Sequence, residues 1–173
     1  MPLKNFSSCW FLSMKPEQTV LSLYKGEAAL AVVMDVGYGS LAKQVFLQPK
    51  PKPVEVEEAI IRVEDEIMRV HAQVQGGFSL VSSDTYVHEI AKRAGAGLAV
   101  GLEDGPETGK VLTREELEFF FNRWADIVSG SPVRASEQPM SKELGAGLLI
   151  LRELLHHLDF KELLLVDALP VAS

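Results

Sequence analysis

A helical repeat of apolar residues in the middle of the chain limits the possible folds more than any other pattern. Its members are Ile60, Val63, Ile67, Val70 and Val74. Successive members are separated by 3, 4, 3 and 4 residues, which places them on one face of an α-helix that Gly76 and Gly77 end. A helix with one apolar face must bury it against another element, so this segment predicts a packed globular core.

Short apolar runs on both sides of this helix predict β-strands. They span residues 28–34, 41–47, 78–81 and 163–166. The first two flank a glycine-rich turn, and we expect them to form an antiparallel hairpin. Residues 20–24 fit two alternatives, a first strand or the end of a short helix that begins near Pro16.

Helix-capping residues predict three more helices. Residues 82–84 supply N-cap side chains for a helix that ends at Gly95, and Thr113 with Glu116 forms a capping box. Ser141 caps the last helix, which carries a leucine on one face at nearly every turn. Strands that alternate with helices predict an α/β fold with a mixed sheet and helices packed on it.

Composition fixes the class of protein. A chain of 173 residues with 47% hydrophobic and 24% charged residues is the size of one soluble domain. We assign residues 15–173 to this domain and residues 1–14 to an N-terminal segment. A net charge of −7 opposes binding to nucleic acid, and the apolar runs are too short to cross a membrane. The single cysteine, Cys9, favours a cytoplasmic location.

The best candidate site is residues 35–40, Asp-Val-Gly-Tyr-Gly-Ser, which follow a buried run. Glycines let backbone N–H groups approach an anion, so Gly37, Gly39 and Ser40 are candidates to bind phosphate. Asp35 is a candidate to hold a divalent cation such as magnesium against that anion. A hairpin turn that needs small residues explains the same string.

A second candidate anion site precedes the helix that starts near residue 85. Ser82, Ser83 and Thr85 offer hydroxyl groups and the N–H groups of a helix N-terminus to the same anion as residues 35–40, although helix capping explains them equally well. His156 and His157 are adjacent on a helix and point about 100° apart, so they cannot share a metal without ligands from elsewhere. Neither a Rossmann fingerprint nor a nucleophilic triad is present.

In their order along the chain, these segments resemble the second domain of the exopolyphosphatase and guanosine-pentaphosphate phosphohydrolase family. The matching segments are residues 17–26, 35–40, 80–91, 112–117, 144–151 and 163–167. Residues 35–40 stand where the family has Asp-Ile-Gly-Gly-Gly-Ser-Thr-Glu, and residues 80–91 resemble its second phosphate loop. The resemblance implies a single actin-like, or ribonuclease H-like, domain with a phosphate or nucleotide ligand.

Several positions depart from the family pattern. Tyr38 replaces a glycine, Leu41 a threonine and Ala42 an acidic residue that helps to bind metal. Ser83 and Asp84 replace the glycines of the second loop, and the sequence has no counterpart of the family's first domain. We therefore expect a degenerate phosphate- or nucleotide-binding domain that is not catalytic alone. There are two alternatives. The chain is half of a phosphoanhydride hydrolase that a partner domain completes, or it is an interaction module without a phosphate ligand.

We also expect this chain to associate with a second copy of itself or with a partner protein. A domain without its usual neighbour must cover the apolar surface that the neighbour would bury. Trp10, Phe11, Leu12 and Met14 give the N-terminal segment apolar side chains for that role, either on its own body or across a dimer. We therefore expect a homodimer or a complex with a partner protein, with residues 9–14 buried in contacts.

Overall fold

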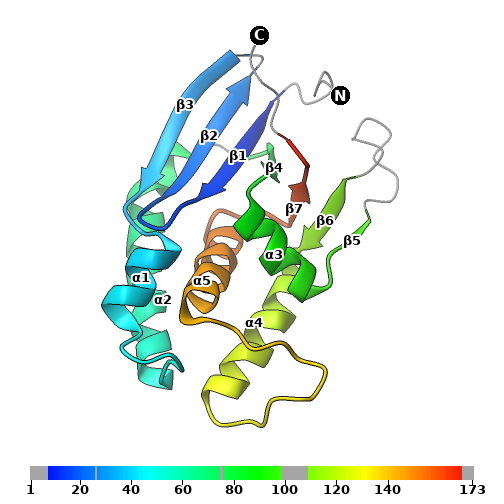
Figure 1. The fold of residues 1–173 in the computed structure, drawn as a ribbon. Coiled ribbons are helices and arrows are strands. Elements are labelled where there is room, and N and C mark those ends of the chain that lie inside the picture. The colour runs from blue at the N-terminus through cyan, green and yellow to red at the C-terminus, as the bar shows by residue number, and fades with distance from the viewer. Residues whose placement is uncertain (1–7, 26, 75, 99–108, 169–173) are drawn as a thin grey trace.

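The computed structural model, which describes residues 8–25, 27–74, 76–98 and 109–168, is built around a seven-stranded mixed sheet in the order β3-β2-β1-β4-β7-β6-β5 (Figure 1). The strands are β1 (Cys9–Met14), β2 (Thr19–Lys25), β3 (Glu27–Met34), β4 (Ser79–Ser82), β5 (Gly97–Leu98), β6 (Lys110–Thr113) and β7 (Glu162–Leu165). β1, β4 and β7 run parallel, and the flanking strands pair antiparallel.

Five α-helices among the described residues contribute side chains to the main core. They are α1 (Tyr38–Val45), α2 (Pro53–Val70), α3 (Thr85–Ala94), α4 (Arg114–Val128) and α5 (Lys142–His157). The predicted α/β class with a mixed sheet is confirmed, and so are the strands near residues 28–34, 78–81 and 163–166. The capping residues are confirmed as well: Asp84, Thr113 and Ser141 each accept a hydrogen bond from the first turn of their helix.

The N-terminal segment is the main correction to the sequence analysis. Residues 9–14 form β1, which pairs with β2 on one side and β4 on the other, so they belong to the centre of the domain. Trp10, Leu12 and Met14 face the helices, whereas Cys9 and Phe11 pack into a smaller cluster on the opposite face. A boundary between residues 14 and 15 is therefore wrong, whereas the expected burial of residues 9–14 is confirmed for all of them except Ser13, which is half-buried.

The predicted hairpin of residues 28–34 and 41–47 is also wrong. β3 pairs with β2, and residues 38–45 form helix α1. Leu41 and Val45 lie one helical turn apart and are both buried, whereas Lys43 and Gln44 face solvent. Of the two alternatives for residues 20–24, the strand is correct.

The residues that follow α3 extend the sheet by two strands. β5 and β6 pair antiparallel at one edge of the sheet, and β6 pairs with β7. Residues 99–108 lie outside the described residues.

Helix α5 is the centre of the helical layer and packs against α1, α2, α3 and α4. Its two glycines allow this packing. A Cβ on Gly145 would lie 2.6 Å from Cζ2 of Trp124, and a Cβ on Gly147 would lie 2.8 Å from Cε1 of Tyr86. Among the described residues, no helix combines the length and the hydropathy needed to cross a membrane.

Candidate functional site

The first predicted phosphate loop lies at the start of α1, where Gly37 is the N-cap residue. A Cβ on Gly37 would lie 2.4 Å from the carbonyl oxygens of Lys15 and Pro16. The glycine is therefore required by the close approach of the turn that joins β1 to β2. Its backbone N–H group donates to Oγ of Ser40 at 3.0 Å.

The backbone N–H groups that we expect to bind phosphate instead donate hydrogen bonds to the turn between β1 and β2. The N–H groups of Gly39 and Ser40 both donate to the carbonyl oxygen of Pro16, each at 2.8 Å. Free N–H groups in the first turn are what makes a helix N-terminus an anion site. Because Pro16 accepts from two of them, this helix is capped by its own chain.

The predicted metal ligand, Asp35, is exposed at the end of β3. Its backbone N–H group donates to Oε2 of Glu66 at 2.8 Å, and Glu66 forms an ion pair with Arg69. The Arg69 guanidinium lowers the pKa of Glu66 mainly through their hydrogen bond. The groups around Asp35 are thus one acid and one base on α2.

The second predicted loop connects β4 to α3, and most of its polar groups bond to the protein. Oγ of Ser82 is buried and donates to the carbonyl oxygen of Leu12 at 2.8 Å. The Asp84 carboxylate accepts from the N–H groups of Tyr86 at 2.8 Å and Met14 at 3.0 Å. The N-terminus of α3 therefore already holds a negative charge, which opposes the binding of an anion there.

Ser83 and Thr85 line a pocket of about 370 Å³ on the outer side of this loop. Its remaining lining residues are His88, Glu89, Lys92, Lys110, Leu165 and Asp167. Nε2 of His88 lies 2.9 Å from the carbonyl oxygen of Val166. With two lysines and two acidic residues, the pocket has no excess of positive charge with which to attract phosphate.

Two tyrosines bring the predicted loops together. The rings of Tyr38 and Tyr86 are stacked with their centroids 3.9 Å apart. One ring stands in the first turn of α1 and the other in the first turn of α3. The sequence analysis was right to place the two loops near each other, but an aromatic contact fills the space between them.

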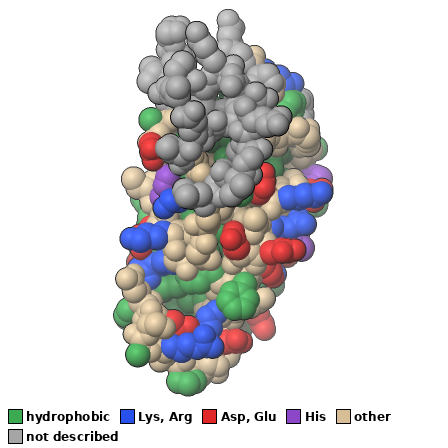
Figure 2. Space-filling model, turned by 90° about the vertical axis from the view of Figure 1, so that its right-hand side faces the viewer, with side chains coloured by type: hydrophobic (Ala, Val, Ile, Leu, Met, Phe, Trp, Pro, Cys, Tyr) green, Lys and Arg blue, Asp and Glu red, His purple; other side chains and the backbone are tan. Residues whose placement is uncertain are grey.

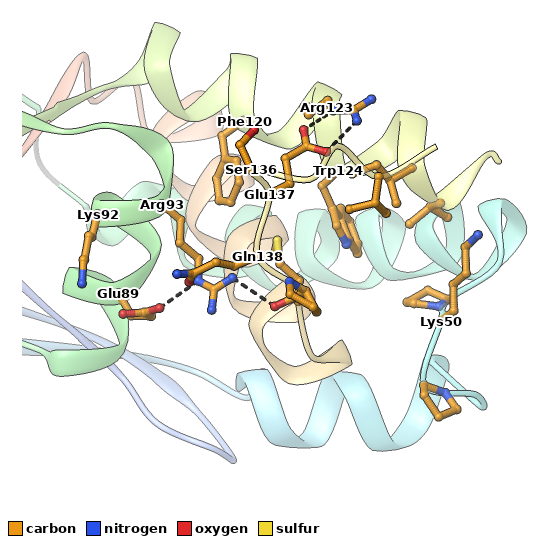
Figure 3. A pocket seen from close by; sticks show the side chains of 17 residues that line it. Lys50, Glu89, Lys92, Arg93, Phe120, Arg123, Trp124, Ser136, Glu137 and Gln138 are labelled. Carbon is orange, nitrogen blue, oxygen red and sulfur yellow. Dashed lines mark hydrogen bonds and ion pairs between the residues drawn. The ribbon is translucent and has the colours of Figure 1, made fainter. Parts of the chain in front are cut away.

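A larger pocket of about 500 Å³ lies between α3, α4, the residues before α2 and the segment that leads into α5 (Figure 3). Apolar side chains contribute much of its lining, including Phe120, Trp124, Val133 and Met140. Figure 2 shows apolar side chains in a hollow on the lower half of the molecule, with basic side chains close by.

The side chains that line the larger pocket carry more positive than negative charge. Arg93 pairs with Glu89, and Arg123 donates to both carboxylate oxygens of Glu137. Among the described residues, Lys50 and Lys92 form no hydrogen bond or ion pair that would neutralise them, and Figure 3 shows them at opposite ends of the lining. Four cations against two carboxylates give this pocket a positive balance in a chain whose net charge is −7.

Comparison with solved structures identifies the fold. The Ppx/GppA phosphatase of Aquifex aeolicus superposes with a TM-score of 0.69 at 18% sequence identity, over 92% of this chain and 53% of that one. An exopolyphosphatase from Cytophaga hutchinsonii gives a TM-score of 0.65 at 8% identity, over 95% and 54%. The chain has the actin-like fold of part of a Ppx/GppA phosphatase.

The chain spans about half the length of these Ppx/GppA structures. An exopolyphosphatase-like protein gives a similar result, with a TM-score of 0.65 and 11% identity. No family model matches the sequence, and no curated protein does. The similarity to Ppx/GppA phosphatases therefore lies in the order and packing of strands and helices. Sequence identities of 8% to 18% do not transfer the roles of individual side chains.

The sequence did not predict the larger pocket between α3 and α4. Its lining comes from separate segments that meet only after folding. One local signal was available: Phe120 and Trp124 are one turn apart on α4 while Arg123 lies between them, so an aromatic stripe runs beside a basic residue.

Proposed function

We propose that this chain is a non-catalytic, ligand-binding relative of the Ppx/GppA phosphatases. The observation that supports this most directly is the pair of hydrogen bonds from the Gly39 and Ser40 N–H groups to the Pro16 carbonyl oxygen. A phosphate at the start of α1 would have to displace a backbone carbonyl group that the hairpin turn holds in place.

The electrostatics of the second loop support the same conclusion. Phosphoryl transfer depends on positioning and on positive groups that stabilise charge in the transition state. Asp84 instead brings a carboxylate to the start of α3, and Ala42 stands where the family has an acidic residue that helps to bind metal. Magnesium at Asp35 would meet one exposed carboxylate beside Glu66, whose own carboxylate already pairs with Arg69.

We place the ligand site in the larger pocket and assign it an anion with an aromatic body, the chemical class to which nucleotides belong. A volume of about 500 Å³ lies within the usual range for small-molecule sites. Phe120 and Trp124 offer apolar ring surface, and Lys50 and Lys92 offer ammonium groups for an anionic substituent.

The absence of catalysis is tested by measuring phosphate release from polyphosphate and guanosine pentaphosphate, with and without magnesium. We expect no release above the rate without protein. Release that depends on magnesium and disappears in Asp35→Ala would contradict the proposal and favour the alternative of a hydrolase half. Light scattering on the same samples tests the expected homodimer.

Ligand binding is tested separately with two aromatic anions, 8-anilinonaphthalene-1-sulfonate and ADP, and with polyphosphate as an anion that has no aromatic body. The chain has two tryptophans, of which Trp10 is buried in the sheet, so a ligand in the pocket should change the fluorescence of Trp124. We expect the double variant Lys50→Glu, Lys92→Glu to bind at least tenfold more weakly, a loss of about 1.4 kcal/mol.

The matched control is Lys161→Glu, an exposed lysine that lines neither pocket. Equal losses in this control and in the double variant would show a general charge effect and contradict the pocket assignment. Binding of polyphosphate alone would contradict it as well.

A further inference from the structure

A cluster of polar side chains joins α2 to α5 at a distance from both predicted loops and both pockets. Nε2 of His157 lies 3.0 Å from Oε1 of Glu64 and 3.1 Å from Oε2 of Glu153. Glu64 is on α2, whereas Glu153 and His157 are one turn apart on α5. Three potential metal-ligand atoms from two helices lie within 4.8 Å of one another.

We propose that Glu64, Glu153 and His157 form a zinc-binding site that links α2 to α5. Imidazole and carboxylate groups together suit zinc and similar transition metals, whereas magnesium prefers oxygen ligands alone. Three protein ligands leave at least one coordination position for water or for a ligand from outside.

Two of the three separations, those from the His157 nitrogen, are close to the ligand spacing that zinc requires. With bonds of about 2.0 to 2.1 Å in a tetrahedral arrangement, two ligand atoms are about 3.4 Å apart. The nitrogen–oxygen separations of 3.0 and 3.1 Å are shorter by roughly 0.3 Å, which small rotations of the side chains can supply. The two carboxylate oxygens lie within 4.8 Å of each other, and the same rotations must bring them to that spacing.

The charges around the cluster favour a divalent cation. The Glu153 side chain is only 1% exposed, and its other oxygen, Oε1, accepts from Arg152, which also pairs with Glu118. Glu118 and Glu153 pair with the Arg152 guanidinium, whereas Glu64 contacts only His157, so with a neutral imidazole the three carboxylates and one guanidinium carry a net charge of −2. Zinc bound by the imidazole and the two carboxylates at its edge would neutralise this excess.

Burial gives the site a fixed ligand. A carboxylate as enclosed as Glu153 has few alternative conformations, and α5 is the most buried helix of the fold. His157 is half-buried and Glu64 is partly exposed, so an ion has an open path from solvent. The site thus combines one rigid ligand with two that can close onto the metal.

Calorimetric titration of the chelator-treated protein with zinc chloride tests the proposal. We expect saturable binding of one zinc per chain, visible absorption from cobalt in the same site, and no binding of magnesium there. At zinc concentrations a hundredfold above the dissociation constant, the melting temperature should rise by roughly 5 °C.

Two variants assign the ligands. His157→Gln and Glu64→Gln should each weaken zinc binding at least tenfold and abolish the rise in melting temperature. His156→Gln is the matched control, because His156 is the adjacent residue and is exposed, and it should bind zinc like the unmodified chain. Absence of saturable binding, or an equal loss in His156→Gln, would overturn the proposal and leave the cluster as an ion-pair network.

Discussion

The rings of Tyr38 and Tyr86 lie within 6° of parallel at a centroid distance of 3.9 Å, and this contact joins the first turns of α1 and α3. Gly147 on α5 leaves room for the Tyr86 ring. Burial raises the pKa of the Tyr86 hydroxyl group, so the ring stays neutral over the whole range in which the protein is studied.

The tyrosine pair should show an energetic coupling. We expect Tyr38→Ala and Tyr86→Ala to destabilise the fold by less together than the sum of their separate effects, with a coupling of about 1 kcal/mol. Urea unfolding of the two single variants and the double variant measures it. Tyr24, which packs on the opposite face of the sheet, supplies the control: Tyr24→Ala combined with Tyr38→Ala should be additive.

The close approach at Gly37 should make this position intolerant of any side chain. In Gly37→Ala the new methyl group would meet backbone oxygens at 2.4 Å, so we expect a loss of about 3 kcal/mol or more in the free energy of unfolding. In Gly76→Ala the methyl group would meet nothing within 4 Å, and we expect little change. Equal unfolding midpoints in denaturant would refute the tight turn.

The position of β1 predicts a protected thiol. Cys9 is fully buried, and burial raises the pKa of its thiol to about 11, so little reactive thiolate exists at neutral pH. We expect Ellman's reagent to react very slowly with the folded chain and to label one thiol per chain after unfolding in guanidinium. Rapid labelling of the folded chain would mean that β1 is not held in the sheet.

Acid should weaken the segment that borders the larger pocket. Hydrogen bonds from Arg123 and from the Arg134 N–H group lower the pKa of Glu137 from 4.5 to about 2. Because the folded-state pKa is the lower one, this contribution to stability is complete above about pH 4.5 and is lost as the pH falls towards 2.

The comparison is between the intact chain and Glu137→Gln. Urea unfolding from pH 6 to 3 should show a steeper loss of stability in the intact chain, because the variant lacks the titrating group. Glu57→Gln, at an exposed position on α2, should follow the intact chain. Parallel curves for all three proteins would contradict the role of Glu137.

The sequence predicted the fold well wherever a long amphipathic helix carried its own caps. Helices α3, α4 and α5 could be located because Asp84, Thr113 and Ser141 each mark a start. It was least accurate in the first 50 residues, where every element is short: β3 was located, but β1 was missed and residues 41–47 were assigned to a strand. The eight residues of α1 contain too few turns to separate a helical period from an apolar run, and β1 is buried on both faces and shows no alternation.

The sequence located a close approach at Gly37 but not the group that approaches it. A glycine beside a buried run indicates close approach, and Gly37 does meet another backbone. The sequence could not say that the approaching group is the Pro16 carbonyl oxygen and not an anion, because that depends on the hairpin of β1 and β2. The zinc cluster was missed for the same reason: Glu64 and His157 are 93 residues apart.

The strand order also has a consequence for the route by which the chain folds. β1 is the first strand along the described chain, yet it lies between β2, which follows it after a short turn, and β4, whose Ser79 pairs with Cys9 from 70 residues away. The meander of β1, β2 and β3 can close through local contacts, whereas the parallel pairing with β4 must wait for a much longer loop to form. A chain that is still being synthesised therefore presents β1 with one unpaired edge until β4 has left the ribosome.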